Sequence, residues 1–348
     1  MPGPRKNKKN RNKHHGGGAP ERRGDVNIVQ DATKVDGEAE QPTEKDSGVP
    51  YIIKSCDVKG RYLVASRDIR QGELILTADP LVVGPPQGCQ PMCLGCYKKL
   101  ELEDNPYRCN GCGWPMCSKG CSGKGKEYGH SEAECRLYES ARSKLVSMKD
   151  TLLTSLYLVV VPLRCLLLET TNPEKYRILL TMEAHNDLRR NLPCIWKINQ
   201  ENVVDRIRQE LGFTQFEEEM IHTVCGFLEV NAFEVGQNDI SIRALYPHAF
   251  YLAHDCVPNT GHTDDKNFTL RIRATIPIPK GDSINLSYAY TLQHLKESKF
   301  FDCKCARCSD PTELGTYAGA LKCPKCNGPV LSTQPLDNSA EWRCNNGA

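Results

Sequence analysis

Four closely spaced pairs of metal-binding residue types constrain this chain more than any other feature. The pairs are Cys93 and Cys96, Cys109 and Cys112, Cys117 and Cys121, and His130 and Cys135. A short spacing lets one tight turn aim two ligands at the same ion, and eight such ligands suffice for two tetrahedral zinc sites. The segment 93–135 is poor in aliphatic residues, so we expect it to rely on metal because it lacks a core. The spacing leaves open whether the two sites are sequential or interleaved.

The chain's 19 cysteines favour metal sites in a reducing compartment over disulfides. The N-terminus is basic but lacks the apolar run of a secretory signal. The most apolar stretch, residues 152–168, contains Pro162 and Arg164 and is shorter than the ~20 residues that span a bilayer. We therefore expect a buried helix or helix pair there and no membrane span.

Composition and periodicity divide the chain into strand-rich and helical regions. Residues 1–48 have almost no aliphatic pattern, which predicts a disordered basic tail. In residues 49–88, apolar runs and turn residues such as Gln71-Gly72 give a hairpin-like signal for two or three short strands. Apolar steps of three and four predict helices over 136–228, and residues 229–292 return to strands. The strand-rich regions are interpreted as two halves of one β unit, so the predicted class is α+β.

Two further cysteine groups each hold three of the four ligands that structural zinc needs. They are Cys303, Cys305 and Cys308 in residues 300–310, and Cys323, Cys326 and Cys344 in residues 318–348. In the last group, a partner at the spacing of the C-x2-C pairs would fall on Gly347. We expect either a truncated zinc-binding segment, through alternative splicing or an incomplete sequence, or a site completed by a ligand other than cysteine.

The four ligand pairs, with Tyr128 shortly before His130, resemble a MYND zinc finger. Inserted between two strand-rich halves, this finger makes residues 50–310 resemble the SET-and-MYND (SMYD) protein-lysine methyltransferases, in particular their arthropod-specific branch. Further motifs occur in the family's order: Lys59-Gly60-Arg61, Asn231 with Phe233, Leu245-Tyr246-Pro247, YLAHDCVPN from Tyr251, Lys280-Gly281-Asp282, Ser287-Tyr288 and CKCARC from Cys303.

The resemblance implies a SET-type β fold split by the MYND finger and the helical block, followed by a zinc-binding post-SET segment. Ligation in the family is interleaved, which implies one zinc on Cys93, Cys96, Cys117 and Cys121 and another on Cys109, Cys112, His130 and Cys135. The resemblance also supplies the missing post-SET ligand, Cys256, for Cys303, Cys305 and Cys308. The alternative for Cys256 is an ordinary small buried residue.

The implied activity is methyl transfer from S-adenosylmethionine to a protein lysine, with Tyr288 orienting the substrate amine. The cofactor-binding positions carried over from the family are Lys59, Gly60, Arg61, Asn231, Ala253, His254 and Tyr288. Each has an ordinary structural alternative: an exposed basic turn for Lys59 and Arg61, a core histidine for His254, and a core or rim aromatic for Tyr288. Histone or non-histone lysines in transcriptional regulation are the implied substrates.

Two departures from the family pattern support an alternative function. Tyr62 stands where the family has a glycine, and Ala253 replaces an asparagine that hydrogen-bonds the cofactor. In this alternative the SET fold is a catalytically weak scaffold, and the finger binds proline-rich peptides of partners such as co-repressors. The basic run over residues 5–13 is compatible with nuclear localisation and non-specific nucleic-acid binding, so we expect a nuclear or cytoplasmic protein.

Overall fold

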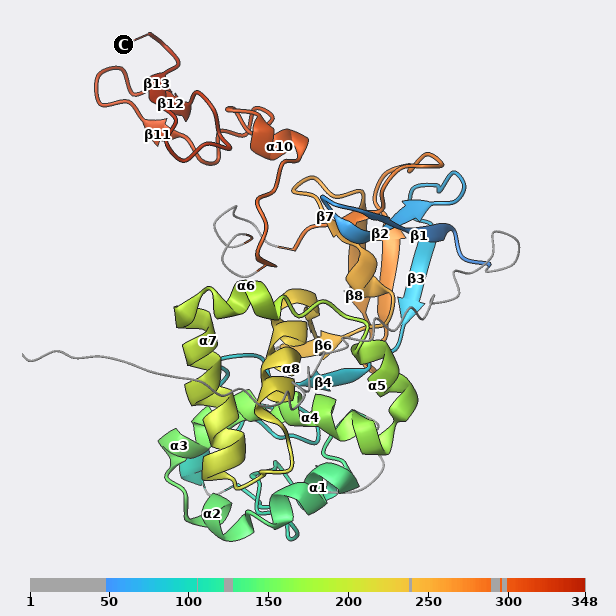
Figure 1. Cartoon of the computed structure of the whole chain (residues 1–348), viewed down its shortest axis with the longest axis vertical. Helices are drawn as coiled ribbons and strands as arrows, with labels where there is room; N and C mark the ends of the chain where they lie inside the picture. Colours follow the sequence, from blue (N-terminus) through green and yellow to red (C-terminus); the bar gives the residue numbers. More distant parts are fainter. Residues whose placement is uncertain are drawn as a thin grey trace, which may run out of the picture. The chain divides into compact units, whose positions relative to one another are not determined.

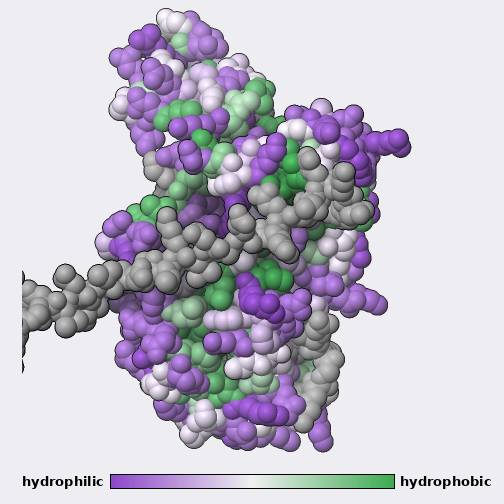
Figure 2. Space-filling view, turned by 45° about the vertical axis from the view of Figure 1, so that its right-hand side comes forward, coloured by the Kyte–Doolittle hydropathy of each residue, from purple (hydrophilic) through white to green (hydrophobic). Residues whose placement is uncertain are grey.

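The computed structural model describes residues 48–104, 106–121, 128–237, 240–288, 295 and 299–347. Apart from residue 48, the tail predicted over residues 1–48 lies outside this described part. Figure 1 shows the helices and strands, and Figure 2 shows one face of the molecule, on which hydrophilic residues predominate with hydrophobic ones in small groups between them. Among the described residues, no helix combines the length and apolar character that crossing a membrane requires.

Strands from both sides of the insertion share sheets, which confirms the prediction of one split β unit and the α+β class. The sheet β3-β9-β8 joins one strand from before the insertion to two from after it, and so does β4-β6-β5. The strands before the insertion are β1 (Tyr51–Cys56), β2 (Gly60–Ala65), β3 (Leu74–Ala78) and β4 (Val82–Gly84). Those after it are β5 (Phe233–Val235), β6 (Ile242–Leu245), β7 (Ala253–His254), β8 (Thr260–Asp264), β9 (Leu270–Ala274) and β10 (Asn285–Leu286).

The hairpin-like interpretation of Gln71-Gly72 is wrong, and the first region holds more strands than the two or three expected. Gly72 does adopt a left-handed conformation, with φ +79°. The strand that follows it, β3, pairs with β9 far along the chain, while β1 and β2 pair with each other. Turn chemistry marks where the chain bends, but burial of an apolar face decides which strand becomes the partner.

The region from residue 132 to residue 231 is mainly helical, and nine of the 15 residues of its longest helix are buried. Residues 152–168 form the end of α3 and most of α4, which confirms the expected buried helix pair. Helix α4 packs on β4, α5 and α8 (Figure 1). The helices are α1 (Glu132–Glu139), α2 (Arg142–Ser147), α3 (Asp150–Ser155), α4 (Tyr157–Thr171), α5 (Pro173–Leu179), α6 (Asn186–Arg190), α7 (Pro193–Asn199), the π-helical η3 (Gln200–Val204) and η4 (Arg206–Glu210), and α8 (Glu218–Asn231).

The cysteine module does not lack a core, contrary to the expectation from its composition. Leu94, Trp114 and Met116 are fully buried and belong to the same hydrophobic core as the helices. The Trp114 ring meets Tyr138 of α1 and Tyr157 of α4 edge-on, with ring centres 5.2 and 5.1 Å away. A few large side chains anchor the module where aliphatic residues are scarce.

The remaining elements are short. A three-stranded antiparallel sheet, β11-β12-β13, carries the last cysteine group. These elements are η1 (Leu102–Asp104), η2 (Lys119–Cys121), η5 (Ala249–Tyr251), α10 (Ala306–Ser309), β11 (Leu321–Lys322), β12 (Pro329–Ser332) and β13 (Trp342–Cys344).

Candidate functional site

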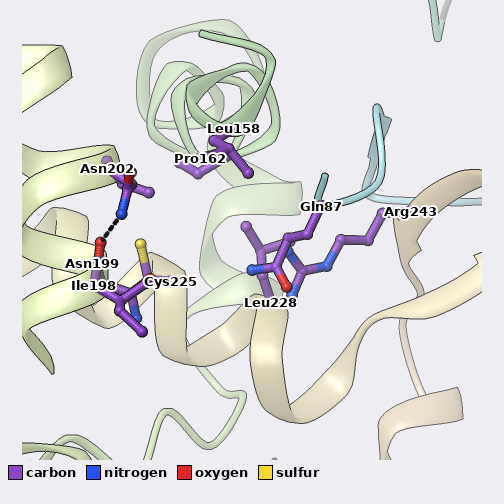
Figure 3. Close-up of a pocket in the computed structure, with 10 residues that line it drawn as sticks. Gln87, Leu158, Pro162, Ile198, Asn199, Asn202, Cys225, Leu228 and Arg243 are labelled. Atoms are coloured by element: carbon purple, nitrogen blue, oxygen red, sulfur yellow. Dashed lines mark hydrogen bonds between the residues drawn. The ribbon is translucent and has the colours of Figure 1, made fainter. Parts of the chain in front are cut away.

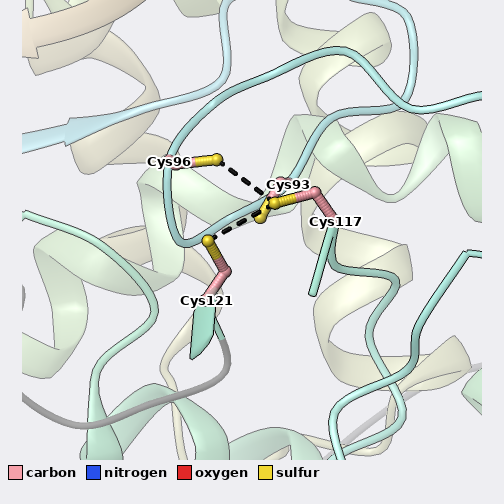
Figure 4. A group of neighbouring side chains, drawn as sticks. All are labelled: Cys93, Cys96, Cys117 and Cys121. Atoms are coloured by element: carbon pink, nitrogen blue, oxygen red, sulfur yellow. Dashed lines mark hydrogen bonds between the residues drawn. The ribbon is translucent and has the colours of Figure 1, made fainter. Parts of the chain in front are cut away.

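The eight ligand candidates of residues 93–135 come together as two interleaved sets. One set is Cys93, Cys96, Cys117 and Cys121 (Figure 4), and the other is Cys109, Cys112, His130 and Cys135. The Cys117 sulfur lies 3.6 Å from the Cys96 sulfur and 3.4 Å from the Cys121 sulfur. Zinc–sulfur bonds of about 2.3 Å in a tetrahedron place neighbouring sulfurs about 3.8 Å apart. The two sets therefore fit one zinc ion each.

The two C-x2-C pairs in this module each form a backbone turn of the same type. The residue after the second cysteine has a positive φ, and its N–H donates to the carbonyl of the first cysteine. The N–H of the first cysteine then donates to the carbonyl one residue further on, which closes the turn. The residues are Cys93, Tyr97 (φ +62°) and Lys98 in one turn, and Cys109, Gly113 (φ +85°) and Trp114 in the other. We call this arrangement the ligand turn.

A buried polar network holds the single histidine ligand in place. His130 Nδ1 lies 2.8 Å from Glu134 Oε2, which leaves Nε2 facing Cys112 Sγ at 3.4 Å. Arg164 of α4 binds both oxygens of Glu134, at 2.8 and 2.9 Å. A carboxylate behind a metal-binding histidine fixes the ring orientation and makes it a stronger ligand.

Glu134 is ionised in this network although its side chain is fully buried. Burial by itself raises the pKa of Glu134, but Arg164 and His130 outweigh it and hold that pKa at about 2. The sequence did not identify Glu134 as functional. In the sequence, Arg164 stands out only as a charge within an apolar run. The structure explains its buried position, because Glu134 is its carboxylate partner.

The structure also groups Cys256 with Cys303, Cys305 and Cys308. The sulfur of Cys256 lies 3.4 Å from that of Cys308 and 4.0 Å from that of Cys303, so this set also fits a tetrahedral zinc ion. Cys303 and Cys308 are buried in a second, small hydrophobic cluster that is separate from the main core, and Tyr288 packs against it.

Tyr288 and His254 are tied to this third cysteine cluster. The Tyr288 backbone N–H donates to His254 Nδ1 at 2.9 Å, so the ring proton is on Nε2, which lies 3.2 Å from Cys256 Sγ. The Tyr288 hydroxyl donates to the Leu252 carbonyl. Burial raises the pKa of Tyr288, so its phenol stays protonated at neutral pH. A metal ion on Cys256 therefore supports the position of Tyr288 through His254.

Arg61 and Asn231, predicted to contact the cofactor, meet at one residue that the sequence did not single out. Arg61 forms an ion pair with Glu183 at 3.0 Å, and the Asn231 amide donates to the carbonyl of the same Glu183 at 2.9 Å. Arg61 also lies over the Tyr251 ring, 5.2 Å from its centre. The charge of Arg61 is thus already paired. Lys59 is therefore the stronger candidate for binding the carboxylate of a ligand.

Lys59 lies in the turn between β1 and β2, and Gly60 begins β2. The Lys59 ammonium donates to Ser283 Oγ at 2.8 Å and lies 5.1 Å from the centre of the Tyr62 ring. Gly60 has φ +63° with open space around its Cα, so conformation rather than crowding accounts for glycine there.

Ala253 lies on β7, directly opposite Asn285 of β10. The side-chain oxygen of Asn285 is buried and has no hydrogen-bond partner in the described part of the chain. The amide that the family places at position 253 is absent, but an amide oxygen without a partner lies on the neighbouring strand. A buried acceptor of this kind usually has a partner.

Lys299 links the two sides of this region. Its ammonium donates to the carbonyls of Glu229 and Val230, at 2.7 and 2.9 Å, in the last turn of α8. It also lies 5.8 Å from the centre of the Tyr288 ring. Asn231 ends the same helix, so Lys299 connects the Asn231 side to the Tyr288 side. No sequence motif pointed to Lys299.

Comparison with known proteins identifies the fold. Residues 60–289, more than half of the chain, match the family model of the SET domain. The chain belongs to the SET-domain family. SET domain-containing protein SmydA-8, isoform B, of Drosophila melanogaster is 31% identical over 318 residues, which cover 84% of this chain and 66% of the relative. A SET and MYND domain-containing protein of Dictyostelium discoideum is 24% identical, over 84% of this chain and 94% of the relative. The resemblance to SMYD proteins is thus confirmed.

The SET-domain chain spans about two thirds of the length of the two Drosophila relatives, 66% and 64%. Histone-lysine N-methyltransferase ASHR1 of Arabidopsis thaliana is 26% identical, over 80% of this chain and 60% of the relative. Among solved structures, the SET domain of LSMT bound to lysine and AdoHcy has a TM-score of 0.35 and 11% identity, covering 79% of this chain and 60% of that one.

A cavity of about 240 Å³ lies among the helices that interrupt the SET domain (Figure 3). Its lining residues are Gln87, Leu158, Pro162, Ile198, Asn199, Asn202, Val203, Cys225, Leu228 and Arg243. Burial lowers the pKa of Arg243, whose side chain reaches into the cavity. The predicted zinc and cofactor residues are not among the residues that line it.

Replacing Glu134 by glutamine is expected to destabilise the SET-domain chain by about 3–5 kcal/mol, because Arg164 is left as a buried charge without its counter-ion. Zinc affinity at His130 should fall about 10- to 100-fold. Urea unfolding and zinc release to a chelator measure the two effects. Glu132→Gln is the matched control, since its exposed ion pair with Arg136 is worth at most ~1 kcal/mol. Equal effects of the two substitutions would contradict the role of Glu134.

Lys299 predicts a specific pH dependence of stability. Burial, helped by Arg243 and opposed by Glu229, lowers the pKa of Lys299 to about 8, against roughly 10.4 in an unfolded chain. Between these pH values the unfolded chain binds a proton that the folded chain has released, so stability rises with pH. The free energy of unfolding of Lys299→Met should lack this rise when measured from pH 7.5 to 10.5, and that of the exposed-site control Lys266→Met should retain it. A rise retained in Lys299→Met would refute the assignment.

Proposed function

We propose that this chain transfers a methyl group from S-adenosylmethionine to a lysine of a protein substrate. The observation that carries the proposal is the fixed, protonated phenol of Tyr288, which His254 and the Leu252 carbonyl hold beside a cysteine cluster suited to zinc. A rigid hydroxyl at this place can orient an amine nitrogen, which is the main protein contribution that methyl transfer requires.

The residues around Tyr288 fit the cofactor in part. The Lys59 ammonium suits its carboxylate, and the Asn231 side-chain oxygen suits its amino group, since the Asn231 amide nitrogen already donates to the carbonyls of Glu183 and Phe227. S-adenosylmethionine supplies an electrophilic methyl group, which moves from sulfur to the lone pair of the lysine nitrogen. Ala253 offers no polar contact, and Asn285 across the strand pair is the available substitute.

Tyr288 acts by position rather than as a base. Because burial raises its pKa, its phenol does not take a proton from the substrate ammonium at neutral pH. The substrate lysine must therefore lose its proton before transfer, and the phenol then holds the neutral amine in line with the methyl group. Lys299, 5.8 Å from the Tyr288 ring centre, adds a positive charge that disfavours a charged amine beside it.

We propose two zinc ions in residues 93–135 and one at the cluster that includes Cys256, all of them structural because four protein ligands complete each set. Histone or non-histone proteins of transcriptional regulation are the proposed substrates, in the nucleus or the cytoplasm. Proline-rich peptides are the proposed partners of the finger.

A catalytically weak adaptor is the second candidate, and Ala253 and the paired charge of Arg61 favour it. Calorimetric titration of the full chain with S-adenosylmethionine separates the two candidates. Measurable binding supports the enzyme, while no binding at millimolar cofactor would rule out methyl transfer and leave the adaptor.

Tyr288→Phe should lower the rate of methyl transfer by about 10²-fold, because the amine loses its orienting hydroxyl. Cofactor binding should remain within a few-fold of the wild type, since only the phenol oxygen is removed. Transfer of a labelled methyl group to a histone mixture, followed by mass spectrometry, measures the rate. Tyr317→Phe, at a 41% exposed site, is the control and should keep full activity. Full activity of Tyr288→Phe would show that another group orients the amine.

A further inference from the structure

The last C-x2-C pair of the chain, Cys323 and Cys326, has the ligand turn found twice in residues 93–135. Asn327 has φ +59°, and its N–H donates to the Cys323 carbonyl at 2.9 Å. The Cys323 N–H donates to the Gly328 carbonyl at 2.8 Å, which closes the turn as in the other two pairs. This backbone aims both sulfurs to one side, as a shared metal ion requires.

A third sulfur joins this pair, so that three candidate metal ligands lie together. Cys344 of β13 joins Cys323 and Cys326, with its sulfur 3.4 Å from that of Cys326. Two N–H groups point at Cys326 Sγ, from the Gly328 backbone at 3.4 Å and from the Asn346 amide at 3.7 Å. Both donors therefore face the sulfur that would bind the ion.

The sheet that carries these cysteines cannot be stabilised by hydrophobic burial. Cys323 and Leu331 are the only buried residues in the range 311–347. Its strands β11, β12 and β13 are two, four and three residues long. Strands this short without a core are marginal in water, and small modules of this kind are usually held by a disulfide or a metal.

The two clusters of residues 93–135 differ from this one at the third residue of the ligand turn. An added Cβ would lie 2.2 Å from the Cys121 carbonyl oxygen at Gly95, and 2.8 Å from Cys135 Sγ at Gly111. In each of the two sets of residues 93–135, the last ligand therefore arrives over a glycine. The equivalent residue in the third turn is Lys325, which is exposed, and no fourth cysteine, histidine or carboxylate joins this set in the described part of the chain.

We propose that Cys323, Cys326 and Cys344 bind a fourth zinc ion whose remaining coordination position, on the Lys325 side, is open to an exchangeable ligand. Water or an external thiolate can take this position. Three thiolates hold the ion and the sheet together, and the open position makes this zinc the most easily removed of the four. The proposal is independent of methyl transfer.

Zinc content of the purified full chain tests the fourth site. Wild type should hold four zinc ions per chain and Cys344→Ser three, while Cys194→Ser, an exposed cysteine outside every cluster, should hold four. A chelator should remove one zinc from wild type faster than the other three, and this fast phase should be missing in Cys344→Ser. Three ions in both wild type and Cys344→Ser, or release without a separate fast phase, would overturn the proposal.

Cobalt substitution tests the open position in the wild-type chain, so the result does not depend only on whether Cys344→Ser folds. Addition of 2-mercaptoethanol to the cobalt-loaded wild-type chain should change the visible absorption of one ion in four, because a thiolate replaces water. The same addition to cobalt-loaded Cys344→Ser should cause no change. An unaltered wild-type spectrum would show that the fourth position is already filled by the protein.

Discussion

The structure depends on one buried carboxylate. Glu134 accepts from His130 on one side and from Arg164 on the other, so a single residue connects a zinc ligand to the longest helix. Arg164 also donates to the Val83 carbonyl of β4 at 2.9 Å, which brings the first half of the β unit into the same network. Charges removed from water are tolerated only when each is paired and hydrogen-bonded. The finger, the helices and the strands therefore cannot be separated without exposing an unpaired charge.

The elements that the sequence predicts well are those whose signal is local. Cysteine spacing identifies the ligand pairs, and apolar periodicity identifies the helix pair in residues 152–168. The interpretation of Gln71-Gly72 fails because strand pairing is not local: β3 finds its partner in β9, which is encoded after the whole insertion. The cysteine module has a core for a similar reason, since Trp114 packs on Tyr138 and Tyr157 from the helical block.

The residues of the candidate site show the same difference between local and non-local signals. Lys59, Asn231, His254 and Tyr288 could be named because short motifs surround them. Glu183 and Lys299 could not, because their roles depend on backbone carbonyls and charges that only the folded chain brings near: Lys299 meets Glu229 across 70 positions of sequence. Composition cannot reveal a lysine that caps a distant helix.

The third cysteine cluster has a consequence for the order in which the chain folds. Its sulfurs at Cys256 and Cys303 are 47 positions apart, and closing a loop of that length costs about 3–4 kcal/mol in the unfolded chain. The small cluster around Cys303 is separate from the main core, so burial in that core does not offset this cost. The residues around Tyr288 thus assemble after the main core, and they open when this cluster loses its metal. Metal supply can then decide how many otherwise folded molecules have a complete site.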